Sequence, residues 1–147
     1  MGKKFQVPTF LEGIQSQASY DKWLSRKAAA HVKRDRTRGN TTATGSEYRI
    51  AIHQAVLESE GLDYYTGEKL DWSLLSTYNN AESQKHKRTY KKKFELLPSV
   101  DHVGDGSGPA NFKICGWRTN DCKNDLSHSE LIEFSKKLIQ HYNELDR

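Results

Sequence analysis

Apolar residues recur at helical spacing near the N-terminus of the chain. A side chain at every fourth position lies on one face of an α-helix, and such a face packs against a core. The repeating positions are Tyr20, Leu24, Ala28 and Val32. Ser19 precedes them with a hydroxyl that can cap a first turn. The pattern therefore predicts a helix over residues 19–38 that buries one face.

Two further stretches have helical periodicity, and each carries a signal at one end. Residues 46–60 are followed by Gly61, and glycine commonly terminates a helix. Residues 127–145 begin with Ser127 and Glu130, which have the spacing of a capping box. The apolar positions of this last segment are Leu131, Ile132, Leu138, Ile139, Tyr142 and Leu145. We expect two more helices, the last of which closes the fold through this apolar stripe.

The pattern changes from helical to extended between these last two helices. Residues 94–103 are predicted to form a strand, and Pro98 within it lacks an N–H, which favours an edge or bulged strand. A glycine-rich loop at 104–109 follows, then a second strand at 111–115 and a short helix at 117–125. The combination of segregated helices and a small strand pair predicts an α+β fold.

Length and composition limit the classes of protein to which the chain can belong. Its 147 residues, 35% of them hydrophobic, fit one domain with a modest core. Two cysteines, Cys115 and Cys122, do not make the disulfide framework of a secreted domain. The apolar runs are too short to cross a membrane, and the N-terminus lacks the hydrophobic core of a signal peptide. We expect a cytoplasmic protein with no membrane partner.

Positive charge is concentrated in two short runs, although the formal net charge is only +4. Thirteen of the 23 Lys and Arg residues lie within 22–38 and 85–93. Clustered cations neutralise phosphates and attract polyanions. One such run is most simply a solvated surface, and two around a candidate site favour nucleic acid. We expect residues 84–93 to be a loop that binds nucleic-acid backbone, with a merely solvated loop as the alternative.

Polar residues that could take part in catalysis or bind a metal lie on three successive small elements. Asp101 and His102 are on the first predicted strand, Asn111 opens the second, and Asn120 and Lys123 are on the short helix. Each residue alone has a structural interpretation, such as a turn cap or an ordinary strand histidine. Together they occur in order within 23 residues. We expect the Asp, His and Asn side chains to converge on one point, as a single-metal phosphodiesterase site requires.

This ordered set resembles the motif of HNH endonucleases, in the ββα-metal (His-Me finger) superfamily. The resemblance rests on Asp101-His102, on Asn111 before an apolar strand and on Asn120-x-x-Lys123, and it covers roughly residues 62–126. It divides the single domain into a helical, basic region 1–61, the nuclease module 62–126 and the closing helix 127–147. The family fold implies two strands and a helix around one metal ion.

The resemblance also implies a role for each residue of the motif. Asp101 and Asn120 would bind one divalent metal, Mg²⁺ or Mn²⁺, whose preference is for oxygen ligands. His102 would act as general base on water, and Asn111 would orient the loop and the histidine. The residues expected to contact DNA are Lys27, Lys33, Arg34, Arg36, Arg38, Lys87, Arg88, Lys91, Lys92, Arg118 and Lys123.

The chain departs from the family where many HNH proteins bind a structural zinc. The second cysteine pair of such a site would fall at Gly116 and Thr119. Structural zinc needs four Cys or His ligands at fixed spacing, so we expect none here. Packing around Tyr64, Tyr65, Trp72 and Trp117 is expected to replace it.

Two functions are consistent with these patterns. The first is a metal-dependent endonuclease that cuts DNA, with a homodimer as one way to cut both strands. The second is a non-catalytic nucleic-acid-binding module that keeps an HNH-like shape, which the missing zinc cysteines favour. A secreted toxin nuclease fits less well, because such toxins usually have a second histidine where this chain has Asn.

Overall fold

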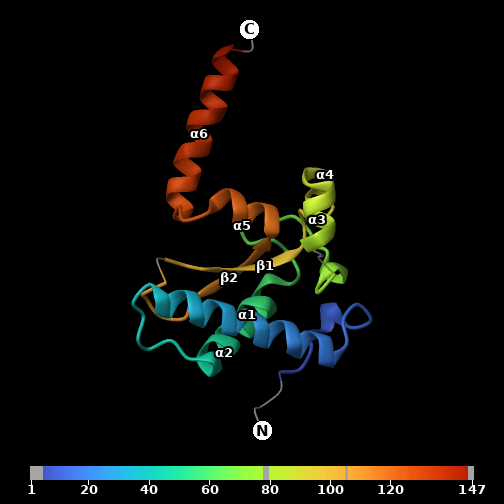
Figure 1. Cartoon of the computed structure of the whole chain (residues 1–147). Coiled ribbons are helices and arrows are strands. Elements are labelled where there is room, and N and C mark those ends of the chain that lie inside the picture. Colours follow the sequence, from blue (N-terminus) through green and yellow to red (C-terminus); the bar gives the residue numbers. More distant parts are fainter. Residues whose placement is uncertain (1–4, 78–79, 105, 146–147) are drawn as a thin grey trace.

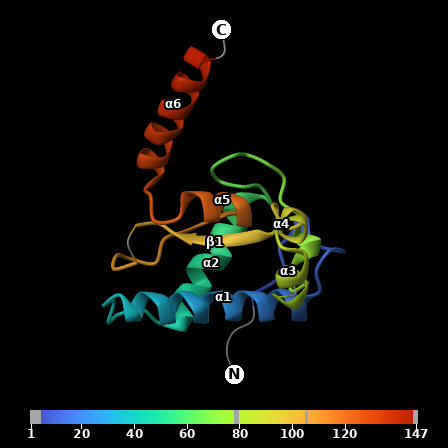
Figure 2. The same ribbon diagram turned by 45° about the horizontal axis from the view of Figure 1, so that its top comes forward.

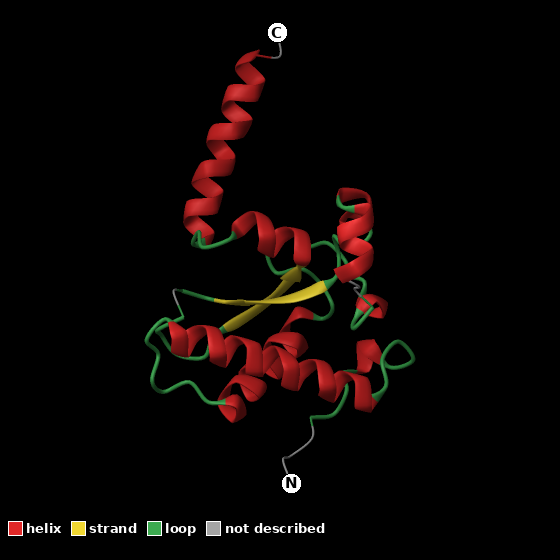
Figure 3. Cartoon of the chain, in the orientation of Figure 1, coloured by secondary structure: helices red, strands yellow, loops and turns green. Residues whose placement is uncertain are grey.

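The computed structural model describes residues 5–77, 80–104 and 106–145. Within these residues the chain forms six α-helices, two short 3₁₀ helices and one two-stranded antiparallel sheet (Figure 1, Figure 3). The 3₁₀ helices are η1 (Thr9–Leu11) and η2 (Trp72–Leu74). The fold is therefore α+β, as the periodicity predicts.

The first two helices form a layer under the sheet. They are α1 (Gln17–Thr37) and α2 (Gly45–Ser59). The cap of α1 is Ser16 and not Ser19, because the Ser16 Oγ accepts the Ser19 N–H at 3.1 Å. The predicted start was therefore two residues late. The buried face is the predicted stripe with additions, and the largest buried side chains of this layer are Tyr20, Trp23, Leu24, Tyr48, Ile52 and Val56.

The sheet is a hairpin of β1 (Pro98–His102) and β2 (Phe112–Gly116). β1 begins at Pro98 rather than at residue 94, since the first position of a strand is one where proline costs least. α5 (Trp117–Lys123) follows β2 directly. Figures 1 and 2 show α1 and α2 on one side of the hairpin and α5 on the other. The hairpin therefore separates two environments.

Alternate residues of β1 point into these two environments, because side chains alternate along a strand. Val100 belongs to the hydrophobic core with α1 and α2, and it pairs with Ile114 of β2. Asp101 contacts Lys123 of α5 on the other side. His102 returns to the core side, where it contacts Asp35 of α1. Neighbours in sequence therefore reach different layers of the fold.

The second basic run is helical, so the expectation of a loop at 84–93 is wrong. It forms α3 (Asn80–His86) and α4 (Arg88–Lys92). The two helices break at Lys87, whose φ of 52° is left-handed. A helix that buries no residue needs no apolar face, and α4 buries none. The sequence of this run therefore has no apolar periodicity that would predict a helix. The ring centroids of Tyr90 and Phe94 lie 4.9 Å apart at the end of this run, where Phe94 is buried.

A buried carboxylate ties the segment after α2 to the junction of β2 and α5. Asp63 is 2% exposed and accepts hydrogen bonds from Gly116 N at 2.8 Å and Thr119 Oγ1 at 2.7 Å. It also accepts the N–H groups of Tyr65 at 2.7 Å and Thr66 at 3.1 Å. We call these five residues the Asp63 cluster.

The Asp63 cluster lies where the family's zinc would be expected from spacing. Gly116 and Thr119 are the two positions that would carry its second cysteine pair. The expectation that aromatic packing alone fills this role is therefore wrong in part. Tyr64 is 53% exposed, and its ring packs on Tyr65 and His128 without entering the core. Hydrogen bonds to the Asp63 carboxylate connect the segment after α2 to the junction of β2 and α5.

The C-terminal helix α6 (His128–Leu145) begins with the predicted capping box. Ser127 N donates to Glu130 Oε1 at 3.0 Å, and Glu130 N donates to Ser127 Oγ at 3.1 Å. The predicted packing of its stripe is wrong, because α6 buries no residue and projects from the body (Figure 1). Leu138, Ile139 and Tyr142 are 56%, 61% and 65% exposed.

Two smaller findings complete the fold. Cys115 is fully buried in β2 and Cys122 is exposed on α5, so only the first is a core residue. Burial raises the pKa of the Cys115 thiol well above its usual range. None of the helices in the described part of the chain combines the length and apolarity needed to span a bilayer.

Candidate active site

Asp101 presents its carboxylate between β1 and α5. The residue is 7% exposed, and its Oδ2 lies 3.2 Å from Nζ of Lys123. The same oxygen accepts the hydroxyl of Tyr65. Burial, together with this hydrogen bond to Asp101, raises the pKa of Tyr65 far above its usual value, so the hydroxyl remains a donor. The carboxylate thus carries one cationic and one neutral donor.

A cavity of about 600 Å³ opens beside this carboxylate, and we call it the site cavity. Asp101 and Asn120 both line it, one from β1 and one from α5. Arg34 of α1 and Arg38, the C-cap residue of that helix, add positive charge to its wall. Its other lining residues are His102, Gly104, Trp117, Asp121, Lys123, Asn124 and Asp125. The hairpin and α5 therefore bring Asp101, His102 and Asn120 to one cavity.

Asn120 is half-buried, and its amide nitrogen donates to Ser99 Oγ at 3.4 Å. This orientation leaves the amide oxygen as the free ligand atom. Asp101 and Asn120 supply one carboxylate and one amide oxygen, which suits a hard divalent cation that keeps open positions for phosphate and water. Among the described residues no three His, Cys, Asp or Glu side chains form a metal-binding group. The donor set fits a cation held by few protein ligands.

His102 lines the site cavity with Asp101 and Asn120, but its ring nitrogens contact Asp35 and Pro109 and not Asp101. Its side chain has no exposed surface, although the residue forms part of the cavity wall. Its Nδ1 lies 2.6 Å from Asp35 Oδ2, and its Nε2 lies 3.0 Å from the Pro109 carbonyl oxygen. Both partners only accept hydrogen bonds, and a neutral imidazole has one N–H to donate. The ring is therefore enclosed between α1 and the glycine-rich loop.

Asp35 is the site residue that the sequence interpretation missed. It is fully buried in α1 and also accepts the Tyr48 hydroxyl at 2.7 Å. Burial alone would raise the pKa of Asp35, but hydrogen bonds from Tyr48 and His102 and the nearby charges outweigh it and lower this pKa. A Cβ at Gly106 would lie 2.5 Å from Asp35 Oδ1, so the loop needs glycine there. One signal was available: Asp35 continues the helical spacing of Ala28, so a polar residue occupies the buried stripe.

A second buried histidine lies near this network and is held differently. His31 Nε2 lies 3.1 Å from the Val100 carbonyl oxygen, and its Nδ1 lies 2.9 Å from an Arg34 nitrogen. One partner accepts and the other donates, as a neutral ring requires. Burial, with the charge of Arg34, lowers the pKa of His31 to about 4. His31 is therefore a neutral structural histidine of α1 that contacts the same strand as His102.

Asn111 is exposed and stands just before β2. Its backbone carbonyl accepts the Val103 N–H at 2.8 Å, which closes the hairpin end. Within the described part of the chain its side chain has no hydrogen-bond partner. The orientation of His102 thus comes from Asp35 and Pro109, and the role expected for the Asn111 side chain is not seen in this arrangement.

The predicted DNA-contacting cations divide into two groups. Lys87, Arg88, Lys91 and Lys92 line one cavity of about 820 Å³ between α4 and α5, which we call the α4 cavity. Lys33 is exposed on α1, and Arg38 is exposed at the C-cap of this helix, where it also lines the site cavity. These side chains are available to phosphates. The first run and the second therefore flank the candidate site.

The other predicted cations have partners inside the protein. Arg36 donates to the Ala43 carbonyl at 2.6 and 3.0 Å and so holds the loop before α2. Arg118 pairs with Glu68 and, at 3.3 Å, with Glu95. Lys123 is 5% exposed and pairs with Asp101. Lys27 is half-buried in a third cavity. Arg36 and Arg118 are engaged within the protein, so they are less available to DNA than the cations that line the α4 cavity.

Comparison of the chain with protein-family models, with curated proteins and with solved structures gives no significant match.

Proposed function

We propose that the chain is a metal-dependent endonuclease of the HNH type that hydrolyses DNA phosphodiester bonds. The observation that carries this proposal is the placement of Asp101 and Asn120 on one cavity with Arg34 and Arg38. β1, β2 and α5 follow one another as the strands and helix of a ββα-metal module do. Two groups of cations flank the cavity, as a polyanionic substrate requires.

Asp101 and Asn120 are the residues that would hold a divalent cation, Mg²⁺ or Mn²⁺. The cation would supply charge neutralisation at the scissile phosphate and the leaving oxygen. Lys123 already places an ammonium group at Asp101 Oδ2, so a cation at that oxygen would require this pair to separate. The ammonium would then be free to contact a phosphate oxygen. This gives Lys123 two roles, in the absence and in the presence of substrate.

His102 is the proposed general base. Its two hydrogen-bond partners indicate which ring nitrogen carries the proton and which one can accept a proton from water. The charged Asp35 carboxylate is the stronger acceptor, so Nδ1–H donates to it and keeps the proton on that side. Nε2 is left as the nitrogen that takes a proton from water. It can do so only when the Pro109 carbonyl moves away, because this oxygen now lies against it. The glycine-rich loop must therefore rearrange during a catalytic cycle.

Plasmid cleavage by the purified protein tests this proposal, with Mg²⁺, with Mn²⁺ and with EDTA. His102→Ala should lower turnover by about 10² or more, which is the scale of a lost general base. Because His102 is buried with two partners, the substitution also loosens the fold. His31→Ala is the matched control, since His31 is a buried histidine that contacts the same strand.

The outcome depends on the difference between the two variants. Loss in His102→Ala beyond that in His31→Ala, measured where both remain folded, supports the base. Equal loss in both reports only structure and removes His102 from the mechanism. No cleavage by the wild type with either metal contradicts the enzyme itself.

A second candidate is a non-catalytic nucleic-acid-binding module with an HNH-like shape. The favouring observation is the enclosure of His102, whose side chain exposes no surface, together with the Asp101–Lys123 pair. This candidate predicts DNA binding that weakens steeply with salt and no cleavage in any metal. The same plasmid assay, run beside a binding titration, distinguishes the two.

One site of this kind cuts one strand at a time. Double-strand cleavage would need two copies of the chain or two successive encounters with DNA. A homodimer thus remains part of the proposal only if linear plasmid appears without a nicked intermediate, which the same gel reports.

A further inference from the structure

Trp117, the first residue of α5, lies where three cavities meet. It lines the site cavity, the α4 cavity and a third cavity of about 370 Å³ between α1 and the start of β1. We call the last one the Trp23 cavity. Trp23 and Trp72 are 1% and 4% exposed, whereas Trp117 is only half-buried. Trp117 is therefore the indole that a bound molecule can reach.

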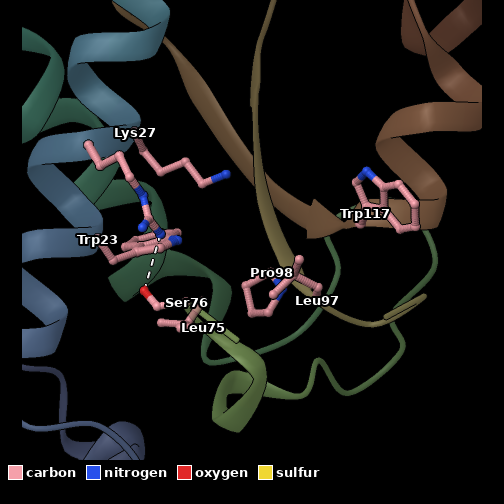
Figure 4. A pocket seen from close by; sticks show the side chains of 8 residues that line it. Trp23, Lys27, Leu75, Ser76, Leu97, Pro98 and Trp117 are labelled. Carbon is pink, nitrogen blue, oxygen red and sulfur yellow. Dashed lines mark hydrogen bonds between the residues drawn. The ribbon is translucent and has the colours of Figure 1, made fainter. Parts of the chain in front are cut away.

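The Trp23 cavity combines apolar walls with positive charge (Figure 4). Leu75, Leu97, Pro98 and the two indoles supply apolar surface, and Arg26 and Lys27 supply the charge. No acidic residue of the described chain lines it. Figure 4 shows Lys27 on the α1 side of this space and Trp117 across it.

The two cations differ in how they are engaged. Arg26 donates to Ser76 Oγ at 3.2 Å, which leaves its other guanidinium N–H groups available. Lys27 has neither an ion pair nor a hydrogen bond among the described residues. Burial, with the charge of Arg26 nearby, lowers the pKa of Lys27. A partly desolvated ammonium without a partner favours an anion beside it.

This composition suits one class of ligand in particular. A phosphate alone needs cations but gains nothing from indole and leucine surfaces. An apolar ligand would leave Lys27 without a counter-charge. A nucleotide unit provides both an aromatic base and a phosphate, and bases stack on aromatic side chains regardless of their identity. In an intact duplex the base faces are already stacked on one another, so only an unpaired base can use Trp117 in this way.

We propose that Trp117 stacks on an unpaired base next to the scissile phosphate, while Lys27 and Arg26 contact the phosphate of that nucleotide. The preferred substrate is then DNA that contains a single-stranded segment. This inference rests on the proposed nuclease function and adds to it the class of DNA. The α4 cavity, which shares Trp117 and Asp121 with the site cavity, continues the path of the strand.

Binding measured in EDTA tests the inference without cleavage. The probes are one fluorescently labelled sequence as a single strand, as a full duplex and as a duplex with a single-stranded flap. The variants are Trp117→Leu, which removes the aromatic plane but keeps apolar bulk, and Lys27→Met, which keeps the stem. The controls are Tyr64→Leu and Lys137→Met, which remove an exposed ring and an exposed charge away from the three cavities.

The wild type should bind the single strand and the flap more tightly than the duplex at equal salt. Trp117→Leu should lose about tenfold in affinity for these two and less than twofold for the duplex. Lys27→Met should weaken binding and reduce the salt slope by about one. Single-strand binding should also quench tryptophan fluorescence in the wild type and not in Trp117→Phe. Both controls should match the wild type.

Two results would overturn the inference. Tighter duplex binding by the wild type would exclude a single-stranded segment as the preferred feature. An equal loss in Trp117→Leu on all three probes would show a structural role for the indole, and the unfolding midpoint of the variant would confirm it. Neither result touches the nuclease proposal, which depends on metal-dependent cleavage. Single-strand preference without cleavage would keep this binding site and remove the enzyme.

Discussion

Asp63 and Asp101 are both buried carboxylates next to α5, and they differ in what surrounds them. Asp63 accepts from three backbone N–H groups and from the hydroxyl of Thr119, which is on a short side chain. Asp101 accepts from a tyrosine hydroxyl and forms an ion pair with a lysine ammonium, and both groups are at the ends of long side chains. Asp101 lines the site cavity, whereas Asp63 lines a separate cavity of about 340 Å³ near the end of α2.

This difference separates a structural carboxylate from one that can exchange partners. Backbone donors cannot leave without unfolding a segment, so the Asp63 cluster fixes the position of α5 on the hairpin. Long side chains can rotate away at the cost of a hydrogen bond and some entropy. The fold thus holds α5 rigidly at its N-terminal end and leaves the Asp101 carboxylate able to accept a different cation.

The largest expected effect concerns the free energy of unfolding in Asp63→Ala. The substitution leaves four donors without their acceptor, and those of Gly116 and Thr119 are buried, so we expect a loss of about 3–5 kcal/mol. Asp101→Ala should lose only about 1 kcal/mol, because water in the site cavity can solvate Lys123 and Tyr65. Urea unfolding of both variants measures the difference. Similar losses at the two positions would contradict the comparison.

Gly116→Ala tests the close approach of backbones beside Asp63. A Cβ at this position would lie 2.9 Å from the Glu95 carbonyl oxygen and 3.4 Å from Asp63 Oδ2. We expect a loss of about 1–3 kcal/mol from overpacking, measured by urea unfolding. Gly108→Ala is the control, since no atom lies within 4 Å of its Cβ. A tolerated Gly116→Ala would show that the cluster can shift.

Lys123→Met tests whether Asp101 can exchange its partner. Removing the ammonium takes away a like charge next to the proposed cation, so we expect Mn²⁺ to bind about tenfold more tightly. Calorimetric titration of Mn²⁺ into the wild type and the variant measures this. Asp101→Asn should abolish the binding, and Asp121→Asn serves as control for a general loss of negative charge. Unchanged Mn²⁺ affinity in Lys123→Met would argue against Asp101 as the ligand.

The smallest expected effect is at α6, which contributes an apolar stripe without burying it. Leu138 is 56% exposed, so Leu138→Ala should change the free energy of unfolding by less than about 0.5 kcal/mol. Leu24→Ala, at a site 1% exposed, should cost about 2–5 kcal/mol. Urea unfolding at low protein concentration compares the two. A large loss in Leu138→Ala would indicate that the stripe is covered in solution.

Features that depend on neighbouring residues were predictable from the sequence. The capping box of Ser127 and Glu130, the glycine loop and the order of β1, β2 and α5 all follow from local spacing. Asp101 and Asn120 share a cavity because the hairpin and the helix after it are consecutive. Short connections leave few ways to place such elements, so the pattern was enough.

Features that depend on distant residues were not predictable. Asp35 meets His102 across 67 positions, and Asp63 meets Thr119 across 56. Strand alternation places Asp101 and His102 on opposite faces of β1, whereas the motif predicts that both side chains converge on one point. The sequence did not predict α4, because a basic helix without a buried face has no apolar periodicity. The stripe of α6 has the period of a packed helix, but periodicity does not identify what it packs against.

The Asp63 cluster has a practical consequence for biochemistry on this protein. Its ligand atoms and its donors all belong to the chain, so a chelator has nothing to extract from it. EDTA would then remove the proposed cation while the hairpin and α5 stay assembled. A single folded sample can be titrated with DNA in the presence of EDTA, and the cleavage reaction can then be started with excess Mg²⁺. Affinity and the rate of the chemical step would thus be separable on the same molecules.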